Sequence, residues 1–559
     1  MKIVLVALNA KYVHTNIAVR YLKNYTANLD YEAVIKEFSI NDRAEKIVEE
    51  IMQQLPQIVC FSCYIWNMEL VLKVASVIRQ IDENIEIVYG GPEVSYDSDE
   101  LVLHRKCDYL IKGEGEYVYR DFVKYKLGLI DKDELKGIAY RSDNNSVIYK
   151  GEQPQINMDE LPFPYEGEEL NNNKIVYYEA SRGCPFNCSY CLSSTIKGVR
   201  QRDIELVKRD LKIFMDKEVP LVKFVDRTFN CSGEYSRQLW KFLCEADTKT
   251  CFHFEIEGDL LREEDIEILR SAPKGRFQFE IGVQTTNNSV LNNISRRMNL
   301  DTLKKRVSEL QEIKNIKLHL DLIAALPGED ISSFIASFDE VYKMRPQELQ
   351  LGFLKLLKGS SIRYDHKKWN YRFLPYPPYE VLSSADISYQ DIIVLKKVEE
   401  MVDKYNNSGK FTNTINYLIK AFESPYEFFY KLSIYYDNKG YFNRSLSGAD
   451  YYRCLFEFNK EILKLDETIV HDVIKYDFLD SNKKSWIPDF LQRNVSKDTE
   501  KELKLKFAEE NNIKALNKIF VEGFNIDMKK VLDNEDYMYR KCCCVYSEQK
   551  SKLSSIYYM

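Results

Sequence analysis

Short apolar stretches alternate with amphipathic stretches over the first 135 residues, and this alternation constrains the fold more than any other feature. Residues 2–8, 57–64 and 85–89 have the composition of buried strands, and residues 17–29 have that of a helix with one apolar face. Strands that alternate with helices indicate a parallel sheet covered by helices on both faces. We therefore predict a doubly wound, Rossmann-like α/β domain over residues 1–135.

The rest of the chain divides into three further parts. Residues 136–173 combine a hairpin candidate with a proline-containing stretch and are predicted to be a linker. A second βα series over residues 174–375 predicts a parallel (β/α)6 partial TIM barrel, whose sites would lie at the carboxyl ends of its strands. Residues 376–559 have mostly helical patterns and are predicted to form a helical domain. The six strand candidates of the barrel are 174–180, 222–225, 252–256, 277–283, 317–324 and 348–356.

Composition excludes several classes of protein. The formal net charge is −7 and the 30% of charged residues are mixed in sign, so a nucleic-acid partner is not expected. No apolar run approaches the ~20 residues that a membrane span needs, and the N-terminal run reads as a first strand rather than a signal peptide. Thirteen scattered cysteines do not suggest a disulfide framework. We therefore expect a cytoplasmic protein without a membrane partner.

Three cysteines carry the strongest chemical signal. Cys184, Cys188 and Cys191 have the spacing C-x3-C-x2-C and follow directly on the strand candidate 174–180. Three thiolates can hold three irons of a [4Fe–4S] cluster, whereas an electron-transfer cluster normally has four cysteine ligands. A structural zinc site would need a fourth nearby ligand, and Cys231 and His253 have no matching spacing. An open fourth iron is therefore the preferred interpretation.

This motif, with an aromatic Tyr190 just before its last cysteine, resembles that of the radical SAM superfamily. The resemblance implies that the open iron chelates S-adenosylmethionine (SAM) and that the reduced cluster cleaves it to a 5′-deoxyadenosyl radical. It also implies a [4Fe–4S] cluster and SAM as cofactors, and a reductant such as flavodoxin or ferredoxin as a partner. Cys184, Cys188 and Cys191 are the predicted metal-binding and catalytic residues.

Later segments are similar to SAM-binding elements of the same superfamily. Glu255 lies in a segment whose Glu meets the SAM amino group, and Gln284 in an I-G-x-Q-S/T element whose Gln reaches the ribose. Arg297 matches an Arg that contacts the carboxylate, with Arg296 as the alternative. Glu280 is a further candidate. Glu255 and Glu280 could instead be structural acids paired inside the barrel.

Two more segments support the resemblance. Residues 225–229 look like the end of the second strand in methylthiotransferase-like relatives, and residues 321–329 resemble a D-L-I-x-G-L-P-G-E element. In the second of these, Ala325 replaces the usual glycine. The substitution puts close approach of the backbone to adenine in question.

The N-terminal domain resembles that of the cobalamin-binding radical SAM class, in which glycines at the carboxyl end of the sheet admit the cobalamin tail. The matching positions are Ser62, Gly90, Gly91, Glu93 and Gly113. The D-x-H-x-x-G element that supplies an axial His elsewhere is absent. His14 occupies the equivalent loop and could ligate cobalt, although a lone loop His is more often a surface or capping residue.

These resemblances imply a cobalamin-dependent methyltransferase acting on an unreactive carbon of a small molecule or peptide. The alternatives are a non-methylating radical SAM oxidoreductase or cyclase, a methylthiotransferase-like enzyme, or a non-catalytic cobalamin or SAM sensor. A second cluster at Cys60, Cys63 and Cys107 fits poorly by spacing. The C-terminal region resembles an uncharacterised helical domain, and consecutive cysteines such as 542–544 cannot easily bind one metal.

Overall fold

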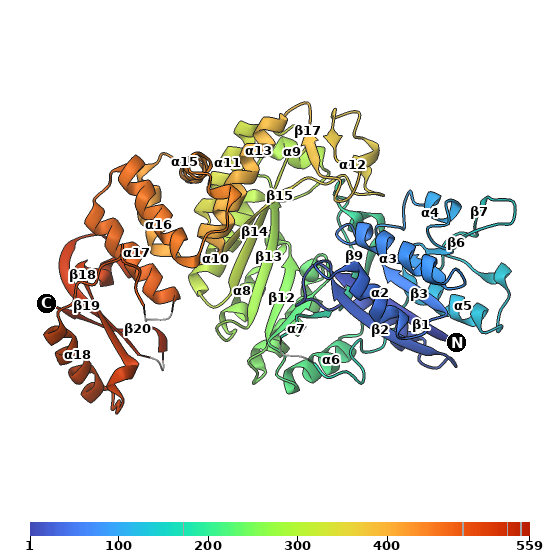
Figure 1. The fold of residues 1–559 in the computed structure, drawn as a ribbon, viewed down its shortest axis with the longest axis horizontal. Coiled ribbons are helices and arrows are strands. Elements are labelled where there is room, and N and C mark those ends of the chain that lie inside the picture. The colour runs from blue at the N-terminus through green and yellow to red at the C-terminus, as the bar shows by residue number, and fades with distance from the viewer. Residues whose placement is uncertain (171–172, 483–485, 534, 548–549) are drawn as a thin grey trace. The chain divides into compact units, whose positions relative to one another are not determined.

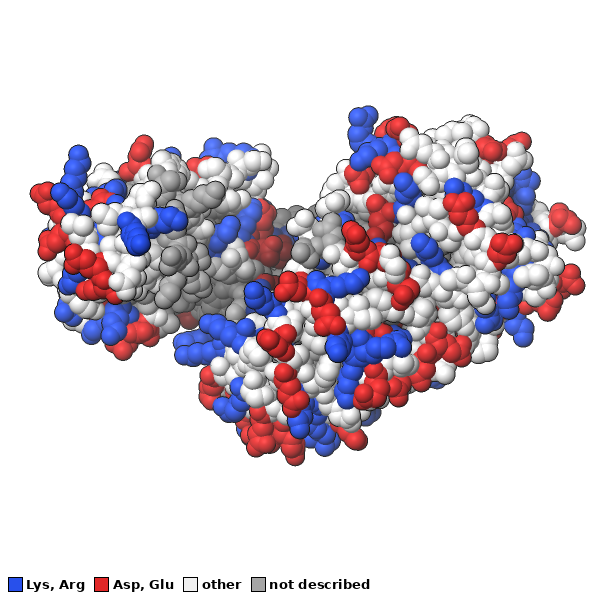
Figure 2. Space-filling model, turned by 90° about the horizontal axis from the view of Figure 1, so that it is seen from below, with Lys and Arg blue, Asp and Glu red and all other residues white. Residues whose placement is uncertain are grey.

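The computed structural model describes residues 1–170, 173–482, 486–533, 535–547 and 550–559. These residues form two compact units, one of Met1–Phe334 with Leu351–Ile392 and the other of Ile335–Gln350 with Ile393–Met559. Among the described residues, none of the helices combines the length and the apolar character that crossing a bilayer would require. On the face drawn in Figure 2, basic side chains lie among acidic ones, in keeping with the mixed charge of the sequence.

The N-terminal domain is built on a seven-stranded sheet with the order β2-β1-β3-β4-β5-β6-β7 (Figure 1). Strands β1 to β5 are parallel, and the hairpin β6–β7 continues the sheet antiparallel. The strands are β1 Lys2–Asn9, β2 Glu32–Ser39, β3 Ile58–Ser62, β4 Glu86–Gly90, β5 Tyr109–Ile111, β6 Ile138–Arg141 and β7 Val147–Tyr149. The helices are α1 Ile17–Tyr25, α2 Ala44–Met52, α3 Met68–Ile81, α4 Glu100–Leu103 and α5 Gly115–Lys126.

Apolar side chains fill both faces of this sheet. Helices α2 and α3 pack on one face through residues such as Ile47 and Val74. Helices α1 and α5 pack on the other through residues such as Val19 and Phe122. Strands buried on both faces explain the continuous apolar runs in the sequence, and the predicted doubly wound domain is confirmed.

The segment expected to be a surface linker is partly buried. The hairpin β6–β7 lies within residues 136–173 and extends the N-terminal sheet. Beyond it, Ile156, Met158 and Leu161 pack with Tyr21 of α1 in a small apolar cluster. The segment after the hairpin is therefore packed against the N-terminal domain, because its apolar residues cover the outer side of α1.

The next part of the chain forms a six-stranded sheet with the order β15-β14-β13-β12-β11-β8. The strand pairs from β8 through β14 are parallel, as predicted. The strands are β8 Val176–Tyr178, β11 Leu221–Phe224, β12 Cys251–Ile256, β13 Phe277–Gln284, β14 Lys317–Ala324 and β15 Glu348–Phe353. The helices are α6 Ile204–Asp216, α7 Gly233–Glu245, α8 Glu263–Arg270, α9 Asn288–Asn293, α10 Leu300–Ile313 and α11 Ile331–Lys343.

Short elements surround the carboxyl ends of these strands. A two-stranded hairpin of β9 Ser181–Cys184 and β10 Gly198–Gln201 follows β8. After β15 come α12 Ser361–Tyr364, β16 Arg372–Phe373 and β17 Val381–Ser383. The alternation of buried and half-buried residues along β13 and β14 shows one apolar face toward the helices and one polar face toward the concave side.

The C-terminal unit is mostly helical, as predicted. Its helices are α13 Tyr389–Met401, α14 Thr412–Leu418, α15 Pro425–Asn438, α16 Gly448–Phe458, α17 Glu467–Ser481, α18 Lys497–Glu510 and α19 Met528–Leu532, with π-helical turns at Val402–Asn407 and Asn459–Leu463. The chain ends in a sheet that was not predicted, formed by β18 Ile519–Ile526, β19 Tyr539–Ser547 and β20 Lys550–Tyr558. Cys542 and Cys544 face one apolar cluster and Cys543 faces another, so the three thiols do not converge.

Candidate functional site

The three motif cysteines lie on a loop held in place from two sides. Cys184 ends β9, and Gly183 before it has φ +102°, where an added Cβ would collide with the carbonyl oxygen of Gly198. Within the loop, the amide of Ser189 donates to the carbonyl of Ile294 at 2.9 Å. The carbonyl of Ser189 accepts from the amide of Ile362 at 3.0 Å. Backbone hydrogen bonds therefore fix the loop, whatever its side chains bind.

The cysteines open into a cavity of about 160 Å³ at the carboxyl ends of the parallel strands. Its walls also come from β12 and β13, which contribute the predicted residues Glu255, Glu280 and Gln284. Among the described residues that line it, there is neither a fourth cysteine nor a histidine. Three thiols alone match a cluster with one open iron better than a closed structural zinc site.

Each thiol is free and two have polar neighbours. Cys188 is buried, and the Nη1 of Arg296 lies 3.7 Å from its Sγ. Burial raises the pKa of the Cys188 thiol and the Arg296 cation partly offsets that rise. The Sγ of Cys184 lies 3.4 Å from the Oγ1 of Thr228. A cation beside a thiol favours the thiolate, which is the form that binds metal.

Buried polar atoms around the cavity suit a polar ligand. The Oε1 of Gln284, the Oε2 of Glu257 and the Oδ1 of Asp321 are buried and make no hydrogen bond within the described part of the chain. Leaving such groups unsatisfied is costly, so they indicate a bound partner. Gln284 also has φ +70°, a left-handed conformation that costs energy for a residue with a side chain. These observations fit the polar amino-acid and ribose groups of SAM.

The acidic residues of the cavity have different partners. Glu255 lies 3.7 Å from the Nη1 of Arg227, and burial raises its pKa despite that cation. Glu280 is bound by His253 and Lys223, at 3.0 and 3.2 Å from its Oε2. Burial alone would raise the pKa of Glu280, but these two groups bring it down to about 2. Burial and the neighbouring carboxylates raise the pKa of Asp321 to about 8.

Arg296 rather than Arg297 belongs to the cavity wall. Arg297 is exposed and does not line the cavity. Arg296 is buried, pairs with Glu257 and donates to the carbonyl of Gly282. Sequence reasoning left Arg296 as the alternative and missed Glu257 and Asp321. Glu257 follows Glu255 at the two-residue period of a strand, which could have identified it.

The predicted cobalamin positions lie at the carboxyl edge of the N-terminal sheet. Ser62 ends β3, beside the end of β1, where the strand order reverses and ligands of open α/β sheets bind. Its Oγ accepts from the Nδ2 of Asn16 at 3.3 Å. Gly90 ends β4 and Gly91 follows it. Gly91 has φ +117°, and an added Cβ would lie only 2.5 Å from the carbonyl oxygen of Cys63. Gly113, with φ +76°, faces open space.

Glu93 and His14 are occupied by other contacts. Glu93 is buried, accepts a hydrogen bond from the hydroxyl of Tyr379, and lies 3.3 Å from the Nζ of Lys358. His14 shares a hydrogen bond of 2.7 Å with the Tyr177 hydroxyl through its Nδ1. Glu93 therefore joins the N-terminal domain to the segment that follows β15, and His14 joins it to β8. One sequence cannot reveal these contacts because the partners are far apart in the chain.

Other contacts place the edge of the N-terminal sheet beside the cysteine cavity. Arg182, two residues before Cys184, pairs with Glu116 of α5 at 2.7 Å. The hydroxyl of Tyr96 donates to the Oγ1 of Thr195 at 2.9 Å, just after the cysteine loop. Burial raises the pKa of Tyr64, on the loop after β3, and the charge of Arg227 in the cavity wall offsets part of that rise.

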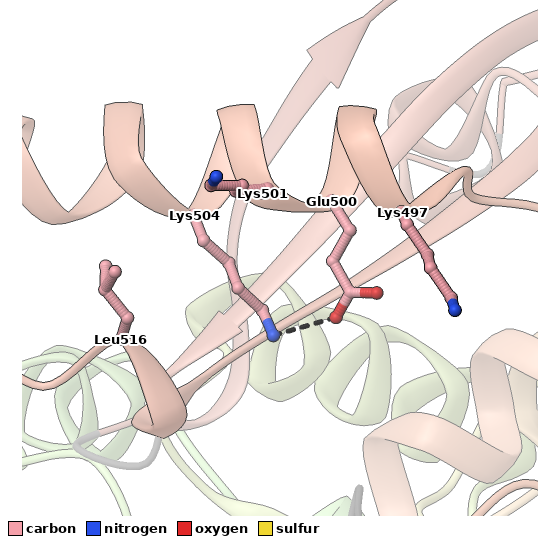
Figure 3. A pocket seen from close by; sticks show the side chains of 5 residues that line it. All are labelled: Lys497, Glu500, Lys501, Lys504 and Leu516. Carbon is pink, nitrogen blue, oxygen red and sulfur yellow. Dashed lines mark ion pairs between the residues drawn. The ribbon is translucent and has the colours of Figure 1, made fainter.

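A second depression, of about 270 Å³, lies on the C-terminal unit and has a different character (Figure 3). It is formed by Lys497, Glu500, Lys501 and Lys504 of α18 together with Leu516. Lys504 is paired with Glu500 at 2.8 Å. These long charged side chains are typical of a solvated helix face, and we assign no chemistry to it.

Three family models match successive parts of the chain. Residues 3–123 match the B12 binding domain, residues 178–341 match the Radical SAM superfamily, and residues 367–545 match a protein of unknown function, DUF4080. The predicted resemblance to cobalamin-dependent radical SAM proteins is confirmed. The first two matches imply a [4Fe–4S] cluster, SAM and cobalamin as cofactors.

Individual proteins give the same picture. The chain is 24% identical over 323 residues to the cobalamin-dependent radical SAM methyltransferase TokK of Streptomyces tokunonensis, covering 54% of this chain and 46% of that one. It is 24% identical to the anaerobic magnesium-protoporphyrin IX monomethyl ester cyclase of Synechocystis sp., covering 58% and 70%. The chain spans less than half the length of TokK and of a carbapenam methyltransferase that it also matches.

Among solved structures, the cobalamin-dependent SAM radical enzyme OxsB with aqua-cobalamin bound superposes with a TM-score of 0.57 at 12% identity. The alignment covers 92% of this chain and 76% of OxsB. At this identity the likeness shows the fold, and it confirms the predicted architecture of an N-terminal Rossmann-like domain followed by a parallel barrel-like sheet.

Proposed function

We propose that this protein is a cobalamin-dependent radical SAM methyltransferase that acts on an unreactive carbon of a small molecule or peptide. One observation carries the proposal: three free cysteines share a cavity with unsatisfied polar side chains, beside the carboxyl edge of a B12 binding domain. The name of the matched relative TokK supports the methyltransferase reading.

In this proposal Cys184, Cys188 and Cys191 hold the [4Fe–4S] cluster and leave one iron for SAM. When bound, the cluster supplies an electron for reductive cleavage of SAM and cobalamin carries the methyl group. The chain orients these groups and excludes competing reactions. Gln284 and Asp321 provide acceptors aimed into the cavity.

Two buried charged groups have positioning roles. Arg296 is immobilised by Glu257 and the Gly282 carbonyl, so its cation stays near Cys188 and stabilises the thiolate. Asp226 accepts from the Ser181 Oγ at 2.6 Å and the Ala180 amide at 3.0 Å, which fixes the start of the strand that leads to Cys184.

On the cobalamin side, Ser62, Gly90, Gly91 and Gly113 would receive the cofactor at the switch point of the N-terminal sheet. We assign Glu93 to domain docking, because its carboxylate is already bound by Tyr379. The proposed domain boundaries remain near residues 135, 174 and 376. A flavodoxin or ferredoxin as reductant and a cytoplasmic location complete the proposal, since free thiols persist in a reducing compartment.

The test uses the full chain, produced anaerobically with cobalamin and reconstituted with iron and sulfide. After incubation with SAM and dithionite, mass spectrometry measures 5′-deoxyadenosine and S-adenosylhomocysteine, and visible spectra measure bound cobalamin. Both products together with bound cobalamin support the methyltransferase. The absence of S-adenosylhomocysteine and of cobalamin, with 5′-deoxyadenosine present, contradicts methyl transfer.

A non-methylating radical SAM reaction is the second candidate. The match to the Synechocystis cyclase covers more of both chains than the match to TokK, which favours it. The two candidates differ in one product, because only methyl transfer from SAM yields S-adenosylhomocysteine. A non-catalytic sensor would bind SAM and form neither product.

A further inference from the structure

Besides the cysteines, the concave face of the second sheet carries a group of metal-binding side chains. His253, Glu280 and His319 stand on β12, β13 and β14, three adjacent parallel strands. Glu280 pairs in register with His319 of β14 on one side and with Glu255 of β12 on the other. His253 lies two residues before Glu255 in β12, and therefore on the same face of the sheet. The potential ligand atoms of the three side chains all lie within 4.8 Å of one another.

We propose that His253, Glu280 and His319 bind a divalent transition-metal ion of the Zn²⁺ type, at a site separate from the cysteine cluster. Two imidazole nitrogens and one carboxylate oxygen are a ligand set that Zn²⁺ and Fe²⁺ use in proteins. Three protein ligands leave a coordination position for water or another small ligand, as at catalytic rather than structural zinc sites.

The ligand atoms of His253 and Glu280 already face each other. Both groups must be deprotonated at the atoms that bind the metal. The Oε2 of Glu280 now lies 3.0 Å from the Nε2 of His253. A metal ion would replace the proton shared between these two atoms, and that proton would leave to solvent.

Lys223 stands next to the proposed site and has a defined place in it. Its Nζ lies 3.2 Å from the Oε2 of Glu280. A carboxylate oxygen has two lone pairs, so Oε2 can bind the metal and still accept from Lys223. Hydrogen bonds of this kind orient metal-binding carboxylates in many sites.

The surroundings balance the charge of a dication and give it access. Glu280 also lines the cysteine cavity, which provides a route for the ion. Glu255 lines the same cavity and interacts electrostatically with Glu280. The Glu280 carboxylate offsets the positive charge of Lys223 beside the site. His253 is buried, with 4% of its surface exposed, whereas Glu280 and His319 are half-buried and remain reachable from the cavity side.

This inference goes beyond the proposed function and does not depend on SAM cleavage. The test uses the full chain with its cluster reconstituted under anaerobic conditions. The protein is equilibrated with one equivalent of Zn²⁺, separated from free metal by gel filtration, and analysed for zinc and iron. Zinc X-ray absorption then distinguishes ligands, since Zn–N and Zn–O distances are about 2.0–2.1 Å and Zn–S distances about 2.3 Å.

The expected result is one zinc per chain with a shell of nitrogen and oxygen only. His253→Ala and His319→Ala are each expected to abolish retained zinc while leaving the iron content unchanged. His104→Ala, at an exposed histidine on another domain, is the matched control and should retain the metal. If the alanine variants fold poorly, His253→Asn and His319→Gln preserve polar packing and should also lose zinc.

Three outcomes would overturn the proposal. Zinc bound through sulfur would mean that the cysteines had captured it. Zinc retained equally by both histidine variants would place it elsewhere. No zinc retained by a folded, iron-loaded wild-type chain would leave His253 and Glu280 as a hydrogen-bonded pair within the sheet.

Discussion

Arg182 joins the N-terminal domain to the strand that carries the first cluster cysteine, and its replacement by Met should loosen that strand. The guanidinium pairs with Glu116 at 2.7 Å and with Glu179 at 2.8 Å. The side chains of Arg182, Glu116 and Glu179 are 15%, 7% and 11% exposed, so solvent screens their charges little. Arg182→Met leaves two buried carboxylates without their cation.

The expected cost follows from this burial. Removing one partner of a buried ion pair costs about 3–5 kcal/mol. If the loss falls on local opening, amide exchange over residues 176–191 should accelerate by about 150-fold to 5000-fold, at 1.36 kcal/mol per factor of ten.

The cost should depend on pH. Burial raises the pKa of Glu116, and Arg182 outweighs it and brings the pKa below its ordinary value. In the native protein Glu116 therefore stabilises the fold above its unfolded pKa of ~4.3, and that stability is lost as pH falls. Without Arg182, burial is opposed only by a backbone hydrogen bond and the charge of Arg200, so the folded pKa of Glu116 rises and its contribution to stability at neutral and alkaline pH falls. The deficit should be larger at alkaline than at acidic pH.

Hydrogen exchange followed by mass spectrometry at acidic and alkaline pH measures this effect. Arg43→Met is the control, because its pair with Glu45 is 85% and 80% exposed and should contribute less than about 1 kcal/mol. Combining Arg182→Met with Glu116→Gln should cost less than the sum of the single changes. Exchange within tenfold of the wild type at alkaline pH, or strictly additive effects, would refute the reasoning.

Three further predictions concern backbone strain and buried charge. Gly91→Ala should lower stability by about 1–3 kcal/mol and reduce cobalamin retention, because the added Cβ would lie 2.5 Å from the Cys63 carbonyl. Gly128→Ala is the control, because Gly128 also has a positive φ but its added Cβ would meet open space, and this variant should retain cobalamin. Burial raises the pKa of Asp226 to about 7, so wild-type stability should fall by about 4 kcal/mol as pH rises from about 4 to 7. The melting temperature of Asp226→Asn should depend less on pH than that of the wild type, and an equal dependence would contradict this. Ala325→Gly should relieve about 1 kcal/mol of backbone strain at φ +68° and so raise the melting temperature slightly. A lower melting temperature would argue against this.

Local patterns were sufficient to predict most of the architecture. Strand β14 has the predicted bounds, residues 317–324, because alternating burial leaves its imprint on consecutive residues. The terminal sheet was missed for the opposite reason. The strand that contains Cys542–Cys544 is buried on both faces by α17 and α18, and that burial depends on packing partners rather than on its own period.

The candidate site shows the same division. The cysteine spacing is local and brought three residues to one cavity. The choice between Arg296 and Arg297 depends on Ser295, whose φ of +55° turns the chain after α9 and directs Arg296 inward. Glu93 meets Tyr379, 286 positions away, so its docking role required the tertiary structure.

In the proposed function, SAM is cleaved in the cavity of Cys184, Cys188 and Cys191. The most direct measurement compares the reconstituted wild type with Cys188→Ala, supplied with SAM and dithionite, and quantifies 5′-deoxyadenosine by mass spectrometry. We expect turnover by the wild type and only background product from the variant. Equal product from Cys188→Ala, or none from an iron-loaded wild type, would contradict it.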